Sequence, residues 1–224
     1  MDVLKYLFPI AIFVFFLLLV IGLTVYRNKR ERARTEQLKS ACTMLGWQFT
    51  ENAPFNWIPN LEKFPLFNTG HSKNIRNMMY GEIEGVKAAL FDYQYVTGSG
   101  KNRATFNQSV VYFEPRDLNL PFFSLRPENV LHKFISALGY QDIDFGQRPL
   151  FSGQYLLRGS DEQAIRNTFN DAILSFYEAN LGTSTDGGGN QLFIFRASKR
   201  TEPLQSQAFI NGALPLYKLF AHRW

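Results

Sequence analysis

The first pattern along the chain is an uninterrupted apolar run near the amino terminus. The 19 residues from Leu7 to Val25 carry no charge. A helix of this length, at about 1.5 Å per residue, approaches the roughly 30 Å thickness of a bilayer's hydrocarbon core. Tyr6 and Tyr26 flank the run, as amphipathic aromatic residues do at headgroup level. A secretory signal would be shorter and would end in small residues. The sequence therefore predicts an uncleaved transmembrane helix.

A basic segment follows the apolar run and leads into an amphipathic helix. Residues 27–40 carry six Lys or Arg side chains against two Glu. Apolar residues then recur with the i, i+3, i+4, i+7 spacing of one helix face. These residues are Leu38, Ala41, Cys42 and Leu45. The pattern predicts a helix from Glu31 that ends at Gly46, and it makes residues 27–40 a basic, helical juxtamembrane neck.

The charges beside the apolar run predict its orientation. Five basic residues follow within nine positions of Val25, whereas only Lys5 and the α-amino group oppose Asp2 on the other side. Positive charge favours the cytoplasmic side, so we expect the amino terminus outside and the following domain in the cytoplasm. The neck should also attract anionic lipid headgroups. The residues that we expect to contact anionic lipid or a partner are Arg27, Lys29, Arg30, Arg32, Arg34, Lys101 and Arg103.

The middle of the chain alternates between apolar and polar residues with the period of β-strands. The longest predicted strands are Asn77–Glu84, Val86–Val96 and Phe106–Glu114, and the shorter ones cover residues 47–50, 118–125, 154–158 and 191–196. Pro121 indicates an edge strand or a bulge, because proline cannot donate a ladder hydrogen bond. The glycines between Asp186 and Asn190 predict a turn. Successive strands joined by short turns favour an antiparallel sheet.

Helical patterns are interleaved with these strands. One predicted helix begins at Pro127 and ends at Gly139, a second is capped by Ser160 with Gln163 and continues through Phe176, and a third covers residues 202–221. The prolines and aromatic residues of 54–67 predict ordered but irregular chain. The fold class is therefore α+β, a mostly antiparallel sheet covered by helices. We expect an anchor at 1–26, the neck at 27–40 and one domain at 41–224.

The overall charge of +5 belongs mainly to the neck. Residues 27–40 contribute +4, whereas residues 41–224 hold 17 basic and 16 acidic side chains. This balance leaves the domain without a dominant phosphate-binding face, so we expect no nucleic-acid partner. The lone cysteine, Cys42, excludes an intramolecular disulfide and fits a reducing compartment, although a cysteine-poor protein outside the cytoplasm would look the same. Its place on an apolar face predicts a core residue.

A glycine-rich loop at Thr97–Asn102 shares Gly100-Lys101 with phosphate-binding loops. The loop lacks the other features of that motif, because Tyr95 stands where the first glycine belongs and Asn102 where Ser or Thr would bind magnesium. It also joins two strands rather than a strand and a helix. We therefore expect a flexible hairpin tip, or alternatively a basic contact loop for a partner or headgroup.

No local pattern predicts a metal or cofactor site. His71, His132 and His222 are far apart and lack the spacing of zinc ligands. Asp92 lies between Phe91 and Tyr93, and a carboxylate in such a run needs a partner, so we prefer a polar partner within the sheet over a catalytic acid. We expect Asp142 and Asp144 in a solvated loop. An enzyme would need a site assembled from these three scattered aspartates.

Several short strings, taken together, resemble a family of uncharacterised bacterial membrane-anchored proteins. They are Phe91-Asp-Tyr-Gln-Tyr95, Thr97-Gly-Ser-Gly-Lys101, Gln108-Ser-Val-Val111, Leu125-Arg-Pro-Glu128, Asp142-Ile-Asp-Phe145 and Tyr155-Leu-Leu-Arg-Gly159. The resemblance covers most of the chain after the apolar run. It implies a bacterial inner-membrane location, and it brings no activity, cofactor or catalytic residue.

The functional hypothesis is a membrane-tethered cytoplasmic binding or scaffolding module. The expected partners are the bilayer through residues 7–25, anionic headgroups near the neck, and a protein that the sequence does not identify. Two alternatives remain open. One is the enzyme with scattered carboxylates, and the other is an accessory subunit of a larger membrane complex, which would need an exposed apolar patch or a small-residue seam on the span.

Overall fold

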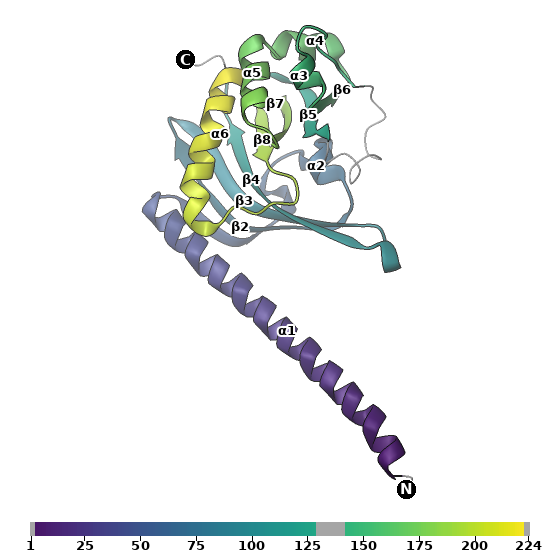
Figure 1. The fold of residues 1–224 in the computed structure, drawn as a ribbon. Coiled ribbons are helices and arrows are strands. Elements are labelled where there is room, and N and C mark those ends of the chain that lie inside the picture. The colour runs from purple at the N-terminus through teal and green to yellow at the C-terminus, as the bar shows by residue number, and fades with distance from the viewer. Residues whose placement is uncertain (1–2, 129–141, 222–224) are drawn as a thin grey trace.

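One long helix carries the chain from the apolar run into the domain. The computed structural model describes residues 3–128 and 142–221. Helix α1 (Val3–Met44) is continuous over 42 residues, so the predicted span and the predicted helix after it are one element. Its part from Ile10 is long and apolar enough to cross a membrane, and none of the apolar window is buried in the protein. The amino-terminal half of α1 projects away from the domain (Figure 1).

The domain is built on one antiparallel sheet of eight strands, which confirms the predicted α+β class. The sheet order is β1-β2-β3-β4-β8-β7-β5-β6, and every neighbouring pair is antiparallel. The strands are β1 (Gln48–Ala53), β2 (His71–Ile83), β3 (Val86–Thr97), β4 (Ala104–Glu114), β5 (Leu120–Pro127), β6 (Tyr155–Gly159), β7 (Ser184–Gly189) and β8 (Gln191–Phe195). Strands β3 and β4 continue into a long hairpin.

Short helices and 3-10 turns connect the strands and cover the sheet. The helices after α1 are α2 (Pro65–Asn68), α3 (Pro149–Ser152), α4 (Glu162–Thr168), α5 (Asp171–Ala179) and α6 (Ser206–Phe220). The 3-10 turns are η1 (Phe55–Trp57), η2 (Leu61–Lys63), η3 (Gly100–Asn102) and η5 (Pro203–Gln205). In Figure 1, α6 runs across the sheet beside the domain end of α1, and α3, α4 and α5 gather at the opposite end.

The two faces of the sheet bury separate cores, as alternation along the strands requires. On one face, Leu90 packs in a cluster with Leu38 and Cys42 of α1 and with residues of α4, α5 and α6. On the other face, Phe91 packs with aromatic residues of the 54–68 segment, including Phe64 and Phe67. The predicted irregular segment is thus ordered by burial of its aromatic side chains. Cys42 is 1% exposed, which confirms it as a core residue.

The position of strand β5 in the sheet decides between the edge strand and the bulge that Pro121 predicted. It lies inside the sheet, between β7 and β6, so it is not an edge strand. The register of β5 against β7 shifts between Leu120 and Phe123, which places Pro121 in a bulge. A bulge accommodates proline because the extra residue is not needed in the ladder.

The predicted turn at Asp186–Asn190 is wrong, because Asp186 to Gly189 belong to strand β7. The glycines are needed for packing rather than for a turn. A Cβ at Gly187 would collide with the Phe123 ring, and one at Gly188 would collide with the Phe122 ring. Bare backbone at these positions makes room for aromatic rings. The actual turn is at Asn190, after Gly189 with its positive φ of 57°.

The predicted helix over residues 160–176 is two helices. Asn170 interrupts it by accepting a 3.1 Å hydrogen bond from the Ile173 amide, which caps α5. The first helix is capped by Asp161, which accepts from the Ala164 amide at 3.0 Å, and not by Ser160. Both residues favour caps because their short side chains bond nearby backbone amides.

The predicted helix start at Pro127 is also wrong. Pro127 is the last residue of β5 and pairs with Tyr155 of β6. The remainder of that predicted helix lies mostly outside the described residues. His132 and His222 lie outside them as well.

Candidate functional site

The domain holds the carboxyl half of α1 through one face of the helix. This face combines the spacings i, i+3, i+4 and i+7 and runs from the end of the apolar run to the core. It consists of Thr24, Arg27, Asn28, Glu31, Arg34, Thr35, Leu38 and Cys42. Only its last part is apolar and buried in the core cluster. Among the others, Arg34 and Thr35 bond side chains of the sheet, and Glu31 bonds the loop after β8.

Arg34 and Asp92 form the central contact between α1 and the sheet. The guanidinium donates two hydrogen bonds to the carboxylate, from Nε to Oδ2 at 2.7 Å and from Nη2 to Oδ1 at 2.8 Å. Both side chains are about one-tenth exposed. The Ser109 hydroxyl and the Asn77 amide donate to the same carboxylate at 2.8 and 3.1 Å. The expectation that Asp92 has a polar partner is confirmed, and the partners come from α1, β2 and β4.

Asn77 occupies a position that its backbone conformation makes available. It lies in the register shift of β2 against β3 and has a positive φ of 52°. Asparagine tolerates this left-handed region better than most residues. The side-chain oxygen accepts a 2.9 Å hydrogen bond from Thr35 of α1, while the side-chain nitrogen donates to Asp92. The bulge therefore orients the Asn77 side-chain amide so that it bonds both Thr35 of α1 and Asp92 of β3.

A second ion pair reverses the polarity of the first. Glu31, one turn before Arg34 on α1, accepts two hydrogen bonds from Arg200 at 2.7 and 2.8 Å. Hydrogen bonds from Arg200 lower the pKa of the Glu31 carboxyl, against a smaller opposing effect of burial. The helix thus carries an anion, Glu31, and a cation, Arg34, which pair with a cation and an anion of the domain, Arg200 and Asp92. Such an alternation fixes the rotation and register of α1, because a slip would place like charges together.

The Glu31 contact should make the stability of the docked helix depend on pH. A carboxyl with a lowered pKa stabilises the folded state above its ordinary value of 4.5, and the contribution is lost as the pH falls through the lowered pKa. Thermal unfolding of the wild type and of Glu31→Gln should therefore differ at pH 7 and converge in acid. Glu162→Gln, in an exposed pair with Arg166, is the control. A constant difference between wild type and Glu31→Gln would contradict this assignment.

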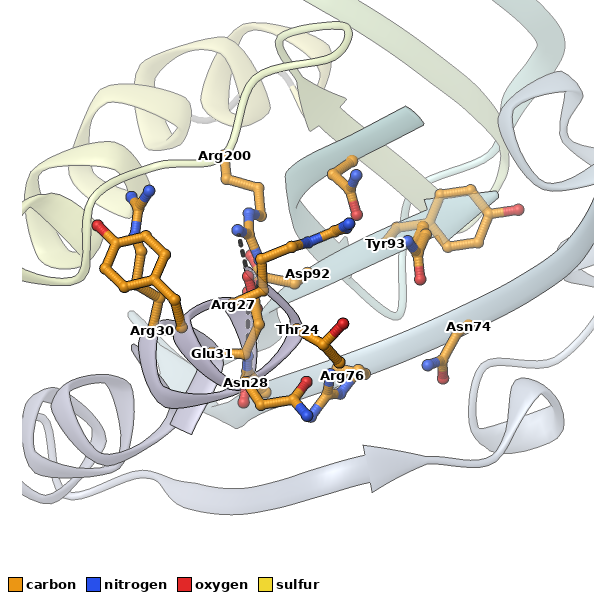
Figure 2. A pocket seen from close by; sticks show the side chains of 14 residues that line it. Thr24, Arg27, Asn28, Arg30, Glu31, Asn74, Arg76, Asp92, Tyr93 and Arg200 are labelled. Atoms are coloured by element: carbon orange, nitrogen blue, oxygen red, sulfur yellow. Dashed lines mark hydrogen bonds and ion pairs between the residues drawn. The ribbon is translucent and has the colours of Figure 1, made fainter. Parts of the chain in front are cut away.

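A polar pocket opens beside the two ion pairs, between α1 and the sheet. Its volume is about 490 Å³. Figure 2 shows Thr24, Arg27, Asn28 and Glu31 entering it from α1, with Asn74, Arg76 and Asp92 below and beside them on the sheet. Arg200 enters from the loop after β8. The full lining is Thr24, Tyr26, Arg27, Asn28, Arg30, Glu31, Asn74, Arg76, Asn77, Asp92, Tyr93, Gln94, Asn107 and Arg200. We call it the juxtamembrane pocket.

The seven basic residues expected to contact lipid or a partner lie in four different settings. Arg27 and Arg30 line the juxtamembrane pocket. Lys29 and Arg32 are exposed on α1 outside that lining. Arg34 is engaged by Asp92 inside the protein, so its guanidinium is not available to a headgroup. Lys101 and Arg103 are exposed at the β3–β4 hairpin tip, which joins strand to strand as expected.

The three aspartates of the enzyme hypothesis do not converge. Asp92 is on β3, whereas the Asp142–Asp144 segment runs along β6, where the Ile143 amide donates to Leu157. Four strands lie between β3 and β6, which at about 4.8 Å per spacing means roughly 24 Å. In residues 3–128 and 142–221, no group of three His, Cys, Asp or Glu could hold a metal ion. These carboxylates therefore do not form one site.

Sequence reasoning singled out Asp92 but missed the other residues that the domain contributes to the pocket. Arg76, Arg200 and the amides of Asn74, Gln94 and Asn107 come from β2, β3, β4 and the loop after β8. No spacing in the sequence links them. The helix side did carry a signal, since Glu31 and Arg34 extend the apolar stripe of Leu38 and Cys42 toward the amino terminus. Charges that continue an apolar face indicate polar docking of the helix.

Comparisons with known proteins show that the fold of this chain is similar to that of one solved structure. No known protein family matches the sequence, and no curated protein matches it. Among solved structures, the chain is similar to the crystal structure of the mycobacterial trehalose monomycolate transport factor A, TtfA, with a TM-score of 0.58 and 12% sequence identity. The similarity covers 86% of this chain and 94% of that one. At this identity it shows that the two chains share a fold, a domain on a mostly antiparallel sheet with helices.

Proposed function

We propose that the chain is a membrane-anchored binding or scaffolding module that serves as an accessory subunit of a membrane transport complex. The observation that carries this proposal is the continuity of α1. The same helix contains the apolar run and, through Glu31, Arg34 and Leu38, a docked face of the domain. A domain fixed in this way keeps a constant position relative to the bilayer. A freely tethered module would need only a flexible linker.

The fold supports the accessory role over the enzyme alternative. The structural neighbour is described as a transport factor, and its whole length is nearly covered by the match. The separated aspartates of this chain offer no comparable support for catalysis. The domain exposes single apolar side chains, among them Leu204 at 91% and Leu181 at 56% exposure, and we take Leu204 as the position at which a protein partner is sought.

The proposal includes the orientation and location that the sequence favours, namely a bacterial inner membrane with the domain in the cytoplasm. Its support is the excess of basic residues after Val25. A fluorescent-protein reporter fused after Trp224 should be active, and a phosphatase that works only outside the cytoplasm should be inactive at the same position. The opposite pair of results would reverse the orientation.

Photo-crosslinking in native membranes tests the accessory role. A photoreactive residue at exposed positions of the span, such as Phe13 and Leu18, and at Leu204 should capture the same membrane-embedded transport protein, identified by mass spectrometry. The variant Asp92→Ala should reduce the crosslink at Leu204 more than those on the span, because it releases the domain from α1. An exposed control position, Glu82, should yield less product. Crosslinks to lipid alone, or to no transport protein, would refute the proposal.

A further inference from the structure

The juxtamembrane pocket contains more positive charge than its own carboxylates neutralise. Its lining has four arginines and two carboxylates. Arg200 is paired with Glu31, and Asp92 is paired with Arg34, which lies outside the lining. Among the residues that the structure describes, Arg27 and Arg30 are in no ion pair. The pocket is therefore left with a surplus of guanidinium groups facing a polar cavity.

Arg76 adds a cation from the sheet that is only loosely satisfied. Its Nη2 lies 3.8 Å from Glu51, whose side chain is 57% exposed, and a contact of this length and exposure is weak. Its Nε is shielded from solvent and has no hydrogen-bond acceptor within the described residues. A buried donor without an acceptor is unfavourable unless a ligand or water completes it. Arg76 and Arg27 approach the pocket from opposite walls, β2 and α1 (Figure 2).

Side-chain amides complete the lining with groups that bind hydroxyls. Asn28, Asn74, Gln94 and Asn107 all line the pocket. None of them makes a side-chain hydrogen bond to another residue of the described chain. Each amide offers donors and an acceptor. The pocket therefore provides cations for an anionic group and amides for neighbouring polar atoms.

The position of the pocket indicates where its ligand comes from. Thr24, the next to last residue of the apolar run, lines the pocket together with Tyr26 and Arg27. A span of Leu7 to Val25 therefore places these residues at headgroup level. Basic pockets beside a transmembrane helix are suited to acidic lipid headgroups. A soluble anion would need no such placement at the membrane boundary.

We propose that the juxtamembrane pocket binds the phosphate of an anionic, hydroxyl-bearing membrane lipid headgroup, with Arg27 and Arg76 as the phosphate ligands. Arg30 contributes charge at the rim, and the four amides bind the headgroup hydroxyls. Arginine is suited to this role because its fork of N–H donors matches phosphate oxygens. The inference deepens the proposed function and rests on its membrane anchoring, since it gives the module a lipid that fixes the domain at the surface.

Lipid binding to the full-length protein tests the site. The protein would be purified in a neutral maltoside detergent and titrated with phosphatidylglycerol or phosphatidylcholine, and native mass spectrometry would count the bound lipids. We expect phosphatidylglycerol to bind about tenfold more tightly than phosphatidylcholine, a ratio that corresponds to about 1.4 kcal/mol. Arg27→Gln combined with Arg76→Gln should weaken phosphatidylglycerol binding by about tenfold or more. Excess glycerol phosphate or inorganic phosphate should not displace the lipid.

The matched control removes the same charge from the outer surface of α1. Lys29→Gln combined with Arg32→Gln should change the affinity by less than about twofold, because neither residue lines the pocket. Arg27→Gln alone should also weaken phosphatidylglycerol binding. Because Arg27 lies on the helix outside the core, this loss of affinity does not depend on folding of the sheet. Equal weakening by both pairs, equal binding of the two lipids, or displacement by free phosphate would each overturn the proposal. None of these outcomes would affect the crosslinks to a transport protein, so the two proposals fail separately.

Discussion

Replacing Asp186 with alanine should lower the free energy of unfolding by about 3–5 kcal/mol, the usual cost of leaving one member of a buried ion pair alone. Asp186 is 0% exposed in β7 and pairs with Arg126 of β5 at 2.6 Å, where Arg126 is 7% exposed. The carboxylate also accepts a 2.8 Å hydrogen bond from the Leu66 amide. Arg126 further stacks over the Phe195 ring at 4.7 Å. The change would therefore leave the buried Arg126 without its carboxylate and the Leu66 amide without its acceptor.

Chemical unfolding of the full-length protein in detergent, followed by circular dichroism, measures this effect. Asp186→Asn should lie between the wild type and Asp186→Ala, because its amide oxygen still accepts from Leu66 while the charge is lost. Glu84→Ala breaks the exposed pair with Lys218 and should cost less than about 1 kcal/mol. If Asp186→Ala were as mild as Glu84→Ala, the pair would not stabilise the sheet in the way described.

Asp92→Ala should have the second largest effect, a loss of about 2–3 kcal/mol, in line with the removal of charge-assisted hydrogen bonds. Three side chains donate to this carboxylate, and they belong to α1, β2 and β4. The loss should be smaller than at Asp186, because Arg34 lies on a helix whose end can leave the sheet and return the guanidinium to water.

Hydrogen exchange localises the Asp92 effect. The variant should increase amide exchange in residues 31–44 of α1, while the amides of β3 and β4 beyond the site stay protected. Lys87→Ala, which breaks an exposed pair with Glu114 on the same strands, should leave residues 31–44 unchanged. Unchanged exchange in Asp92→Ala would show that the apolar residues Leu38 and Cys42 are sufficient to hold the helix.

The sequence predicted those elements whose residues repeat with a regular period. Strands β3 and β4 alternate clearly, and both were found within a few residues of their bounds. Strand β7 was missed because three of its six residues are glycine, a composition typical of turns. Its strand conformation depends on the rings of Phe122 and Phe123, which are more than sixty positions away. The conformation of β7 is therefore set by tertiary packing and not by the local propensity of its residues.

The candidate site shows the same limit. The need of Asp92 for a polar partner was evident from its apolar neighbours, but its identity was not, because Arg34 is 58 positions away in sequence. The basic neck was expected to face lipid as a whole. The structure divides it by helix face, with Arg34 toward Asp92, Arg27 toward the pocket and Arg32 exposed on α1. The sequence alone could not make that division, since the opposing residues come from four separate elements.

We infer that α1 and the domain form one rigid body. A distance measurement between nitroxide labels at Arg32→Cys and Lys87→Cys, in the full-length protein in lipid nanodiscs, tests it directly. Both positions are exposed, whereas Cys42 is buried and burial raises the pKa of its thiol, which disfavours labelling there. We predict one narrow distance distribution that broadens in Asp92→Ala. A broad distribution in the otherwise unchanged protein would contradict the claim and make the helix a flexible tether.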